Sequence, residues 1–182
     1  MKDFDACFDQ FTASAFRLET LAHYGTLEAD PRFTAFRERA ALPDRSVRTS
    51  PWLRRMATTT AAGKRWSRVH VMGNPLSEYE RFELVAYVES AAAGEQIGIS
   101  DRTDHPQLVG LGRDFWLFDA GTSEAFAALL RYDDDGVYLD AEVTRDAGVI
   151  RACEADRDLA LRYSVPLNEY LAARAARQVA AA

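Results

Sequence analysis

Residues 68–119 open with RVHVM (Arg68–Met72), in which apolar and polar side chains alternate as they do in a half-buried strand. Glycine, asparagine and proline at 73–75 break this pattern. Apolar residues then recur at helical spacing from Ser77 to Ala93, which predicts a long helix with one broad apolar stripe.

Two further strands are predicted after this helix. Gly94 is well placed to end it, and QIGI at 96–99 follows as a short strand. DFWLFD at 114–119 is strongly hydrophobic and predicts a third strand. The order strand, helix, strand, strand indicates an α/β fold, a mixed sheet flanked by helices.

The chain before this core carries helix signals and one ambiguity. Apolar residues among the first fifteen recur at helical spacing, whereas residues 15–19 alternate, so both a helix and a strand are compatible with this stretch. Asp30-Pro31 and Ser50-Pro51 each combine an N-capping residue with proline, which predicts helices that run to about residues 41 and 62.

The C-terminal part is predicted to hold a hairpin followed by helices. Residues 124–132 are interpreted as a strand from their context, although their alanines and leucines also suit a helix. An acidic turn with glycine leads into a strand at 137–143. Helices are predicted at 146–163 and 168–179.

Length and composition fit one compact domain. The chain has 182 residues, of which 48% are hydrophobic and 27% charged, as is usual for a protein that buries a core. We expect a single α/β domain over residues 1–182. It would consist of a helical N-terminal portion at 1–49, an α/β core at 50–145 and a helical tail at 146–182.

The sequence also predicts where the protein resides. No stretch approaches the roughly 18 apolar residues that cross a bilayer, and the first residues lack the apolar run of a secretory signal. Cys7 and Cys153 lie far apart and fit neither a disulfide framework nor a CxxC site. We expect a cytoplasmic protein without membrane contact.

Charge is distributed unevenly along the chain. The net charge is −6, yet residues 45–68 contain seven Lys and Arg residues and no Asp or Glu. This basic segment is either an attachment site for phosphate or an acidic partner, or a solvated face that pairs with the acidic remainder. The overall negative charge argues against independent binding of nucleic acid.

Motifs of known chemistry are missing from the sequence. The glycines of 110–113 precede a strand and lack the rest of a phosphate loop. Zinc-ligand spacing and a GxSxG nucleophile motif are both lacking. We therefore expect no metal and no cofactor, and Cys153 is interpreted as a packed residue of a helix stripe.

One candidate pocket follows from topology. If the first two strands are parallel, ligands gather beyond their carboxyl ends. The first residues of the central helix, 77–79, add free backbone N–H groups that favour an anion. The side chains at these two strand ends are Asn74, Ser77, Ser100, Asp101 and Arg102.

Several runs together resemble a large family of actinobacterial proteins, a domain-of-unknown-function family of about this length. They are Ser14–Glu19, Arg68–Val71, Pro75–Arg81, Ala93–Ile97 and Asp114–Asp119. The resemblance covers nearly the whole chain and ends near Val165–Leu167 and Tyr170. It implies a regulatory role, because members are often encoded beside XRE-type helix-turn-helix regulators.

The strand–helix–strand–strand order is also similar to a phospholipase D-like half-domain. That superfamily uses the catalytic signature HxK followed by an aspartate. Here Met72 stands two residues after His70, and Gln107 two residues after His105, so lysine is missing in both places. This resemblance implies a scaffold that binds without catalysis, because fold does not carry function by itself.

These observations favour a non-catalytic, cytoplasmic regulatory or interaction protein that works with a helix-turn-helix regulator and that forms a homodimer in one version of the hypothesis. The alternatives are a phosphodiesterase-like enzyme and a small-ligand sensor, both using the strand-end pocket. The residues expected to take part in binding are Arg68, Asn74, Tyr79, Arg81, Glu83, Asp101, Arg102, Asp114, Trp116 and Asp119. Two alternatives stay open for individual members: core packing for Trp116 and a structural salt bridge for Arg81. Glu83 is either an ordinary boundary residue or a partly buried carboxylate held by arginine.

Overall fold

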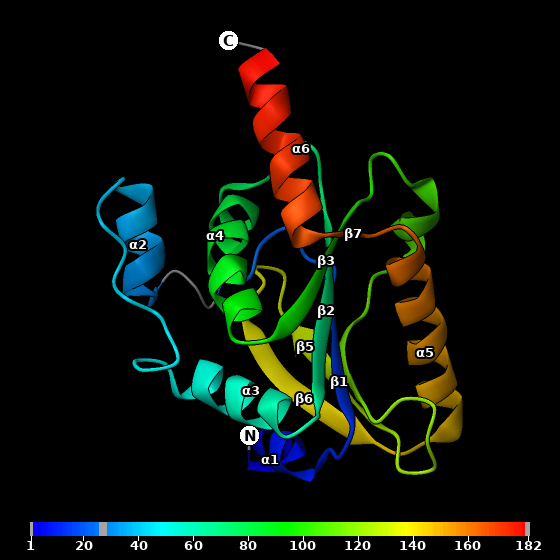
Figure 1. Cartoon of the computed structure of the whole chain (residues 1–182). Helices are drawn as coiled ribbons and strands as arrows, with labels where there is room; N and C mark the ends of the chain where they lie inside the picture. The colour runs from blue at the N-terminus through cyan, green and yellow to red at the C-terminus, as the bar shows by residue number, and fades with distance from the viewer. Residues whose placement is uncertain (1, 26–28, 181–182) are drawn as a thin grey trace.

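A computed structural model describes residues 2–25 and 29–180 of the chain, and Figure 1 shows the helices and strands within them. The elements are α1 (Lys2–Gln10), β1 (Ser14–Glu19), α2 (Pro31–Arg37), α3 (Pro51–Ala61), β2 (Arg65–Met72), α4 (Glu78–Ala92), β3 (Glu95–Asp101), the 3₁₀-helix η2 (Pro106–Gly110), β4 (Asp114–Phe118), β5 (Phe126–Tyr132), β6 (Tyr138–Thr144), α5 (Ala147–Arg162), β7 (Val165–Pro166) and α6 (Leu167–Ala180).

The strands form one mixed sheet in the order β6-β5-β4-β1-β2-β3-β7. The strands β1, β2 and β3 are mutually parallel, whereas β4, β5, β6 and β7 pair antiparallel to their neighbours. The α/β class and the β5–β6 hairpin are therefore confirmed, and the parallel pairing of β2 with β3 meets the condition on which the strand-end pocket depends.

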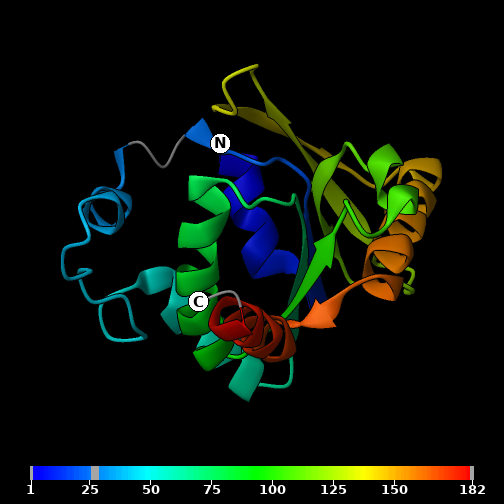
Figure 2. The ribbon, with the colours of Figure 1, turned by 90° about the horizontal axis from the view of Figure 1, so that it is seen from above.

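Helices cover both faces of this sheet. The helix α5 packs on one face, and α1, α3 and α4 pack on the other, which we call the front face (Figure 1). The view from above shows α2 outside α4, farthest from the sheet (Figure 2). Because both faces are covered, even polar residues of the central strands become buried.

The strand β1 shows this most clearly. Phe16 and Leu18 join the core under α5, and the alternate residues Arg17 and Glu19 face the front. The ambiguous stretch at 15–19 is thus a strand, so the N-terminal portion expected to be helical contributes the centre of the sheet. This stretch is a strand because its backbone pairs with β2 along one edge and with β4 along the other, which places β1 in the middle of the sheet.

Predicted helix starts are confirmed at atomic detail. The side chains of Asp30, Ser50 and Ser77 each accept a backbone N–H bond at the first turn of α2, α3 and α4. The C-terminal tail is not purely helical, because β7 pairs with Gly98 and Ile99 of β3 before α6 begins. Among the described residues no helix is long and apolar enough to cross a bilayer.

Candidate functional site

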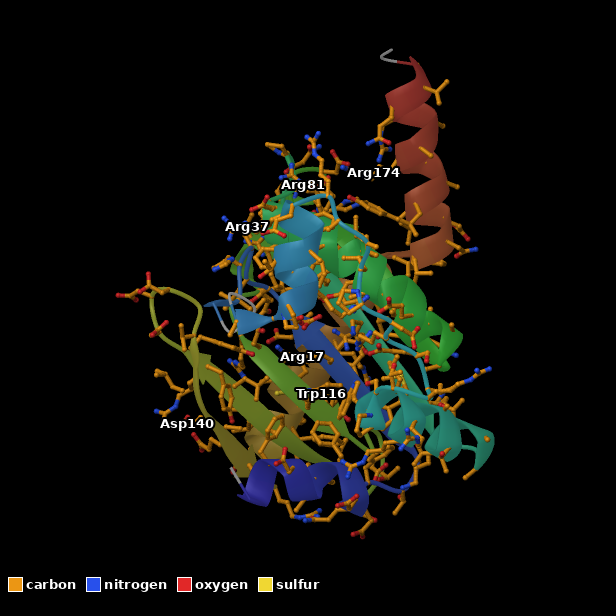
Figure 3. All side chains as sticks on the ribbon, turned by 90° about the vertical axis from the view of Figure 1, so that its left-hand side faces the viewer. Arg17, Arg37, Arg81, Trp116, Asp140 and Arg174 are labelled. Carbon is orange, nitrogen blue, oxygen red and sulfur yellow. The ribbon has the colours of Figure 1, made fainter. Side chains whose placement is uncertain are left out.

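A cavity of about 430 Å³ opens on the front face, between α1, α3 and α4 and over the centre of the sheet. Figure 3 looks onto this face and places Arg17 and Trp116 near its middle. We call this cavity the aromatic pocket, because aromatic side chains make up seven of its eleven lining residues. They are Phe4, Tyr24, Trp52, Tyr79, Trp116, Tyr132 and Tyr138.

The floor of the aromatic pocket is charged. Arg17 and Glu19 come from β1 and Arg68 from β2, side by side in the parallel register of these strands. Arg17 Nε lies 3.6 Å from Glu19 Oε1, and Arg68 Nη1 donates to Glu19 Oε2 at 2.8 Å. Arg68 Nε also donates to Glu95 Oε1 at 2.7 Å. The four side chains form a continuous row of ion pairs across three strands.

Asp114 anchors the far end of this row. It accepts hydrogen bonds from Arg17 Nη2 at 2.7 Å, from the backbone and hydroxyl of Thr20 at 2.9 and 2.7 Å, and from the Tyr24 hydroxyl. Tyr132 accepts a further bond from Arg17 Nη2 at 3.1 Å. The position of the Arg17 guanidinium is thereby fixed from two sides.

These contacts set the protonation of the floor. Burial alone would raise the pKa of Glu19, but the charges of Arg68 and Arg17 outweigh burial and lower this pKa to about 2. Burial raises the pKa of Tyr132 to about 12, despite the opposing charge of Arg17. At neutral pH the floor holds ionised Glu19 and arginines, and the surrounding tyrosines stay protonated.

Arg17 still has one unused donor. Its side chain is 5% exposed, and Nη1 is buried without any described residue accepting a hydrogen bond from it. Buried polar groups of a folded protein normally have a partner. Because Nη1 has almost no accessible surface, it is enclosed by the protein and is not offered to a molecule in the aromatic pocket.

Glu83 lies beside the pocket on α4, one turn after Tyr79. Burial and the charge of Glu19 raise the pKa of Glu83 to about 7, against the opposing charges of Arg68 and Arg45. Glu83 is half-buried, as a boundary residue is, and the charges of Arg68 and Arg45 act on its carboxylate.

Of the predicted binding residues, the structure gathers one group around the aromatic pocket. Arg68, Tyr79 and Trp116 line it, and Asp114 supports its floor. Trp116 is also 6% exposed and packs edge-on against Phe8 at 5.0 Å, so pocket lining and core packing coincide in this residue.

A second group lies at the strand ends, where a ligand pocket was expected. Asn74 and Asp101 line a cavity of about 490 Å³ there, together with residues of α6. Asp104 and Glu169 add negative charge to this cavity, and Arg177 adds one positive charge. The excess of carboxylates disfavours phosphate at this site.

The remaining strand-end residues serve the fold. Ser100 is fully buried and donates to Ala160 O at 3.2 Å, and Arg102 donates to Thr20 O at 2.6 Å. The N-terminus of α4 is occupied by the protein's own carboxylate, because Glu80 and Ser77 form a capping box. A ligand anion would have to displace Glu80.

Asp119 and Arg81 also lie outside the aromatic pocket. Asp119 accepts backbone N–H bonds from Thr12, Ala13 and Ser14 at 2.7 to 3.0 Å, which fixes the start of β1. Arg81 is exposed near the top of the view in Figure 3, where it lines a shallow cavity between α4 and α6.

Several residues of the basic segment at 45–68 make contacts with other parts of the protein. Arg45 pairs with Glu89 at 3.1 Å, Arg55 with Asp9 at 3.2 Å, and Lys64 donates to the Phe11 carbonyl at 2.5 Å. The interpretation as a face that pairs with the acidic remainder accounts for these residues.

Sequence reasoning missed half of the floor. Arg17 and Glu19 alternate with apolar residues in β1, a pattern that also fits a solvent-exposed face. Only the coverage of both faces of the sheet reveals that they are buried. The pocket tyrosines 24, 132 and 138 carried no sequence signal, since they come from a loop and from two separate strands.

Within the described ranges, no group of three His, Cys, Asp or Glu residues is arranged to hold a metal ion. A search of curated proteins finds no match to this chain. A protein-family comparison does give a match, which spans residues 2–172 and thus every strand and the whole aromatic pocket. On that match, the chain belongs to the family described as a domain of unknown function, DUF6879.

Proposed function

We propose that this protein is a non-catalytic regulatory protein that binds a small aromatic ligand in the aromatic pocket. The proposal is carried by the lining of the cavity, in which seven aromatic side chains surround a charged floor of Arg17, Glu19 and Arg68. The cavity volume of about 430 Å³ falls within the usual range for ligand sites, about 300–1,000 Å³.

The chemistry of the floor favours binding over catalysis. Glu19 is a weak base with its low pKa, and the raised pKa values of the tyrosines keep them protonated. None of the described lining residues is a serine, threonine, cysteine or histidine, the side chains that most often act as nucleophiles or proton carriers.

Ligand screening by tryptophan fluorescence tests this proposal, because Trp52 and Trp116 line the pocket. Aromatic compounds that bind should change the emission and raise the melting temperature, as any ligand of the folded state must. Tyr138→Ala, at the half-buried rim, should weaken binding about fivefold through loss of one aromatic contact.

Leu139→Ala provides the matched control. Leu139 is the next residue of β6, is 60% exposed and does not line the pocket. If no aromatic compound alters the fluorescence or the melting temperature, or if hits bind Tyr138→Ala as tightly as the parent protein, the proposal is wrong.

A helix-turn-helix regulator as partner is a second proposal, which one surface supports. Two adjoining cavities of about 760 and 480 Å³ lie between α4, α6 and β3 and share Val88 and Leu171; we call them the α4–α6 groove. Val88 is 51% exposed and Leu161 46% exposed in this groove. Exposed apolar side chains that line one groove are typical of protein contacts.

Co-purification from the native host tests the partner proposal. Val88→Glu should abolish recovery of a helix-turn-helix regulator, whereas Val109→Glu should not, because Val109 is 70% exposed on η2 outside the groove. Recovery of such a regulator by both variants would place the contact elsewhere, and failure of the parent protein to recover one would contradict the proposal. Sedimentation of the purified protein tests the homodimer.

The phosphodiesterase alternative has weaker support. His70 is fully buried, and its Nδ1 lies 2.8 Å from the hydroxyl oxygen of Tyr87. It does not line the strand-end cavity. The relation to phospholipase D-like proteins stays a prediction, and phosphodiesterase turnover that disappears in Asp101→Ala would support it.

A further inference from the structure

The helix α4 carries apolar side chains on its outer face as well as on its buried side. Arg81, Val85 and Val88 follow one another at helical spacing on the outer face, where Val85 is 37% and Val88 51% exposed. The buried side packs into the protein through Phe82 and Tyr87. A helix that is apolar on both sides is normally covered on both. We therefore expect the outer valines to be covered by a binding partner.

The helix α6 forms the opposite wall of the α4–α6 groove. Both cavities of the groove contain Val88 and Leu171, which therefore lie at its middle. Only the cavity beside β3 contains Leu167, and only the other cavity contains Arg81 and Arg174. Figure 3 shows both arginines near the top of the view. The groove thus has an apolar end beside β3 and a cationic end between the two helices.

The positive charge of the cationic end is not balanced within the described part of the chain. Glu89 lies at this end, but its carboxylate already pairs with Arg32 and, at 3.1 Å, with Arg45. Neither Arg81 nor Arg174 forms an ion pair with a described residue. Arg81 is exposed and Arg174 is half-buried, so a partner can reach both. Carboxylates on the partner would complement them.

We infer that the α4–α6 groove binds an amphipathic helix of a partner protein, with an apolar stripe along the valines of α4 and carboxylates between Arg81 and Arg174. The inference rests on the proposal that this groove is a protein contact, and it does not require the partner to be a helix-turn-helix regulator. Two helical walls with side chains at helical spacing suit a third helix. The C-terminal end of the bound helix belongs at the arginines, because its free carbonyl groups carry partial negative charge.

Two other occupants fit the groove less well. An extended strand would find only Glu95–Ile97 of β3 free, because β7 already pairs with Gly98 and Ile99, and strands usually have about five or six residues. A second copy that docks through the same groove would bring no free carboxylate. The acidic lining residues are Glu89 and Glu95, and arginines of the same chain pair with both.

Labelled peptides test the inference by fluorescence anisotropy with the full chain. Each peptide is a helix of about four turns with the same leucine stripe, and its last turn carries glutamate, glutamine or lysine. We expect the glutamate peptide to bind at least about fivefold more tightly than the lysine peptide, with the glutamine peptide between them, and high salt to reduce the difference.

Charge reversal of the protein supplies the matched test. Arg81→Glu combined with Arg174→Glu should reverse the order, so that the lysine peptide binds most tightly. Arg151→Glu is the control, because Arg151 is exposed on α5 at the other face of the sheet and should leave the order unchanged. Since the peptides are compared on the same protein, a general loss of stability does not imitate a reversed order.

Three results would overturn the inference. They are equal or tighter binding of the lysine peptide to the parent protein, an order that reversal of both arginines leaves unchanged, and no binding of any peptide. A dimer that Val88→Glu dissociates would also overturn it, because a second copy would then cover the groove. If co-purification still recovers a helix-turn-helix regulator that Val88→Glu loses, the partner proposal stands although the inference fails. The expected peptide order without such a regulator supports the inference and contradicts the regulator as partner.

Discussion

Asp114 is satisfied entirely inside the protein. Its side chain is 3% exposed and accepts from Arg17, from Thr20 twice and from Tyr24. In such a buried ion pair the Coulomb attraction mainly offsets the cost of removing both charges from water. Removing one partner leaves the other charge buried and unpaired, which is far more destabilising than losing a surface pair.

We expect Asp114→Ala to lower the free energy of unfolding by about 3–5 kcal/mol, because it strands the Arg17 guanidinium. Urea denaturation followed by fluorescence measures the change. Asp140→Ala is the control, since Asp140 pairs with Arg131 at the exposed surface and should hardly affect stability. Equal effects of the two substitutions would mean that the Arg17–Asp114 pair is not buried as described.

Glu83 makes stability depend on pH in the opposite direction from Glu19. Its pKa is raised from 4.5 to about 7, so between these values the folded protein holds a proton that the unfolded chain has lost. Stability from this residue therefore falls as pH rises through that window. Glu19, with its lowered pKa, contributes stability above pH 4.5 that is lost as pH falls toward 2.

Glu83→Gln isolates the first effect. The variant should gain stability relative to the parent protein on going from pH 5 to pH 8, by on the order of 1–3 kcal/mol. Partial exposure of Glu83 places the effect toward the lower end of this range. Denaturation curves of both proteins at several pH values give the difference, and a difference that is constant with pH would refute the raised pKa.

Single residues of the site were hard to predict for a common physical reason. Arg68, Asp114 and Trp116 stand in strands with a clear hydrophobic pattern, in which charged or large aromatic residues are easy to single out. Arg17 and Glu19 are equally polar, yet an alternating strand fits a solvated face as well as a buried one. Whether the face is solvated or buried depends on the packing of α1, α3 and α4. Most of this packing joins residues distant in sequence, so no local pattern predicts it.

At the scale of elements, the β5–β6 turn supports the pocket from the side. Gly136 adopts φ +73°, and a Cβ placed on it would lie 2.5 Å from the carbonyl oxygen of His23. Gly136 O also accepts from Gly25 N at 2.9 Å. The turn thus holds the segment that carries Tyr24, which lines the pocket and bonds to Asp114.

Gly136→Ala should therefore destabilise the protein by about 1–3 kcal/mol through strain at a positive φ, and should also weaken ligand binding through displacement of Tyr24. Gly112→Ala is matched to it, because a Cβ at Gly112 meets no atom within 4 Å. Thermal denaturation and fluorescence titration measure the two effects. Identical behaviour of both alanine variants would show that the close approach to His23 is not required.

Element types and their approximate bounds could be predicted because hydrophobic periodicity and helix capping depend on residues that are close together in sequence. Proline after an N-cap marked the starts of α2 and α3, and alternation marked β2 and β6. Strand order could not be predicted, since pairing of β1 with β4 joins residues about a hundred positions apart. The short strand β7 was also missed, because Val165–Pro166 is too brief to show a period.

At the scale of the whole molecule, the sheet is built from two sequence halves that meet at a central seam. The strands β1, β2 and β3 come from the first half and β4, β5, β6 and β7 from the second. The β1–β4 pair joins the halves at the centre of the sheet, and the short β3–β7 pair joins them at one edge. The aromatic pocket straddles this seam. Arg17 and Arg68 belong to one half, and Trp116, Tyr132 and Tyr138 to the other.

Because the pocket straddles this seam, we expect that it can also form from two separate polypeptides that associate. A break at Gly112–Arg113, two exposed residues between β3 and β4, would give fragments 1–112 and 113–182. We expect neither fragment alone to bind the aromatic compounds that bind the whole protein, and the co-expressed pair to reassemble and bind them, because the β1–β4 and β3–β7 ladders and their flanking core can form again. Fluorescence titration of the pair against each fragment would decide. Since the ligand contacts both pieces, it would favour their association, so the same pocket could serve as a ligand-dependent fastener between two polypeptides.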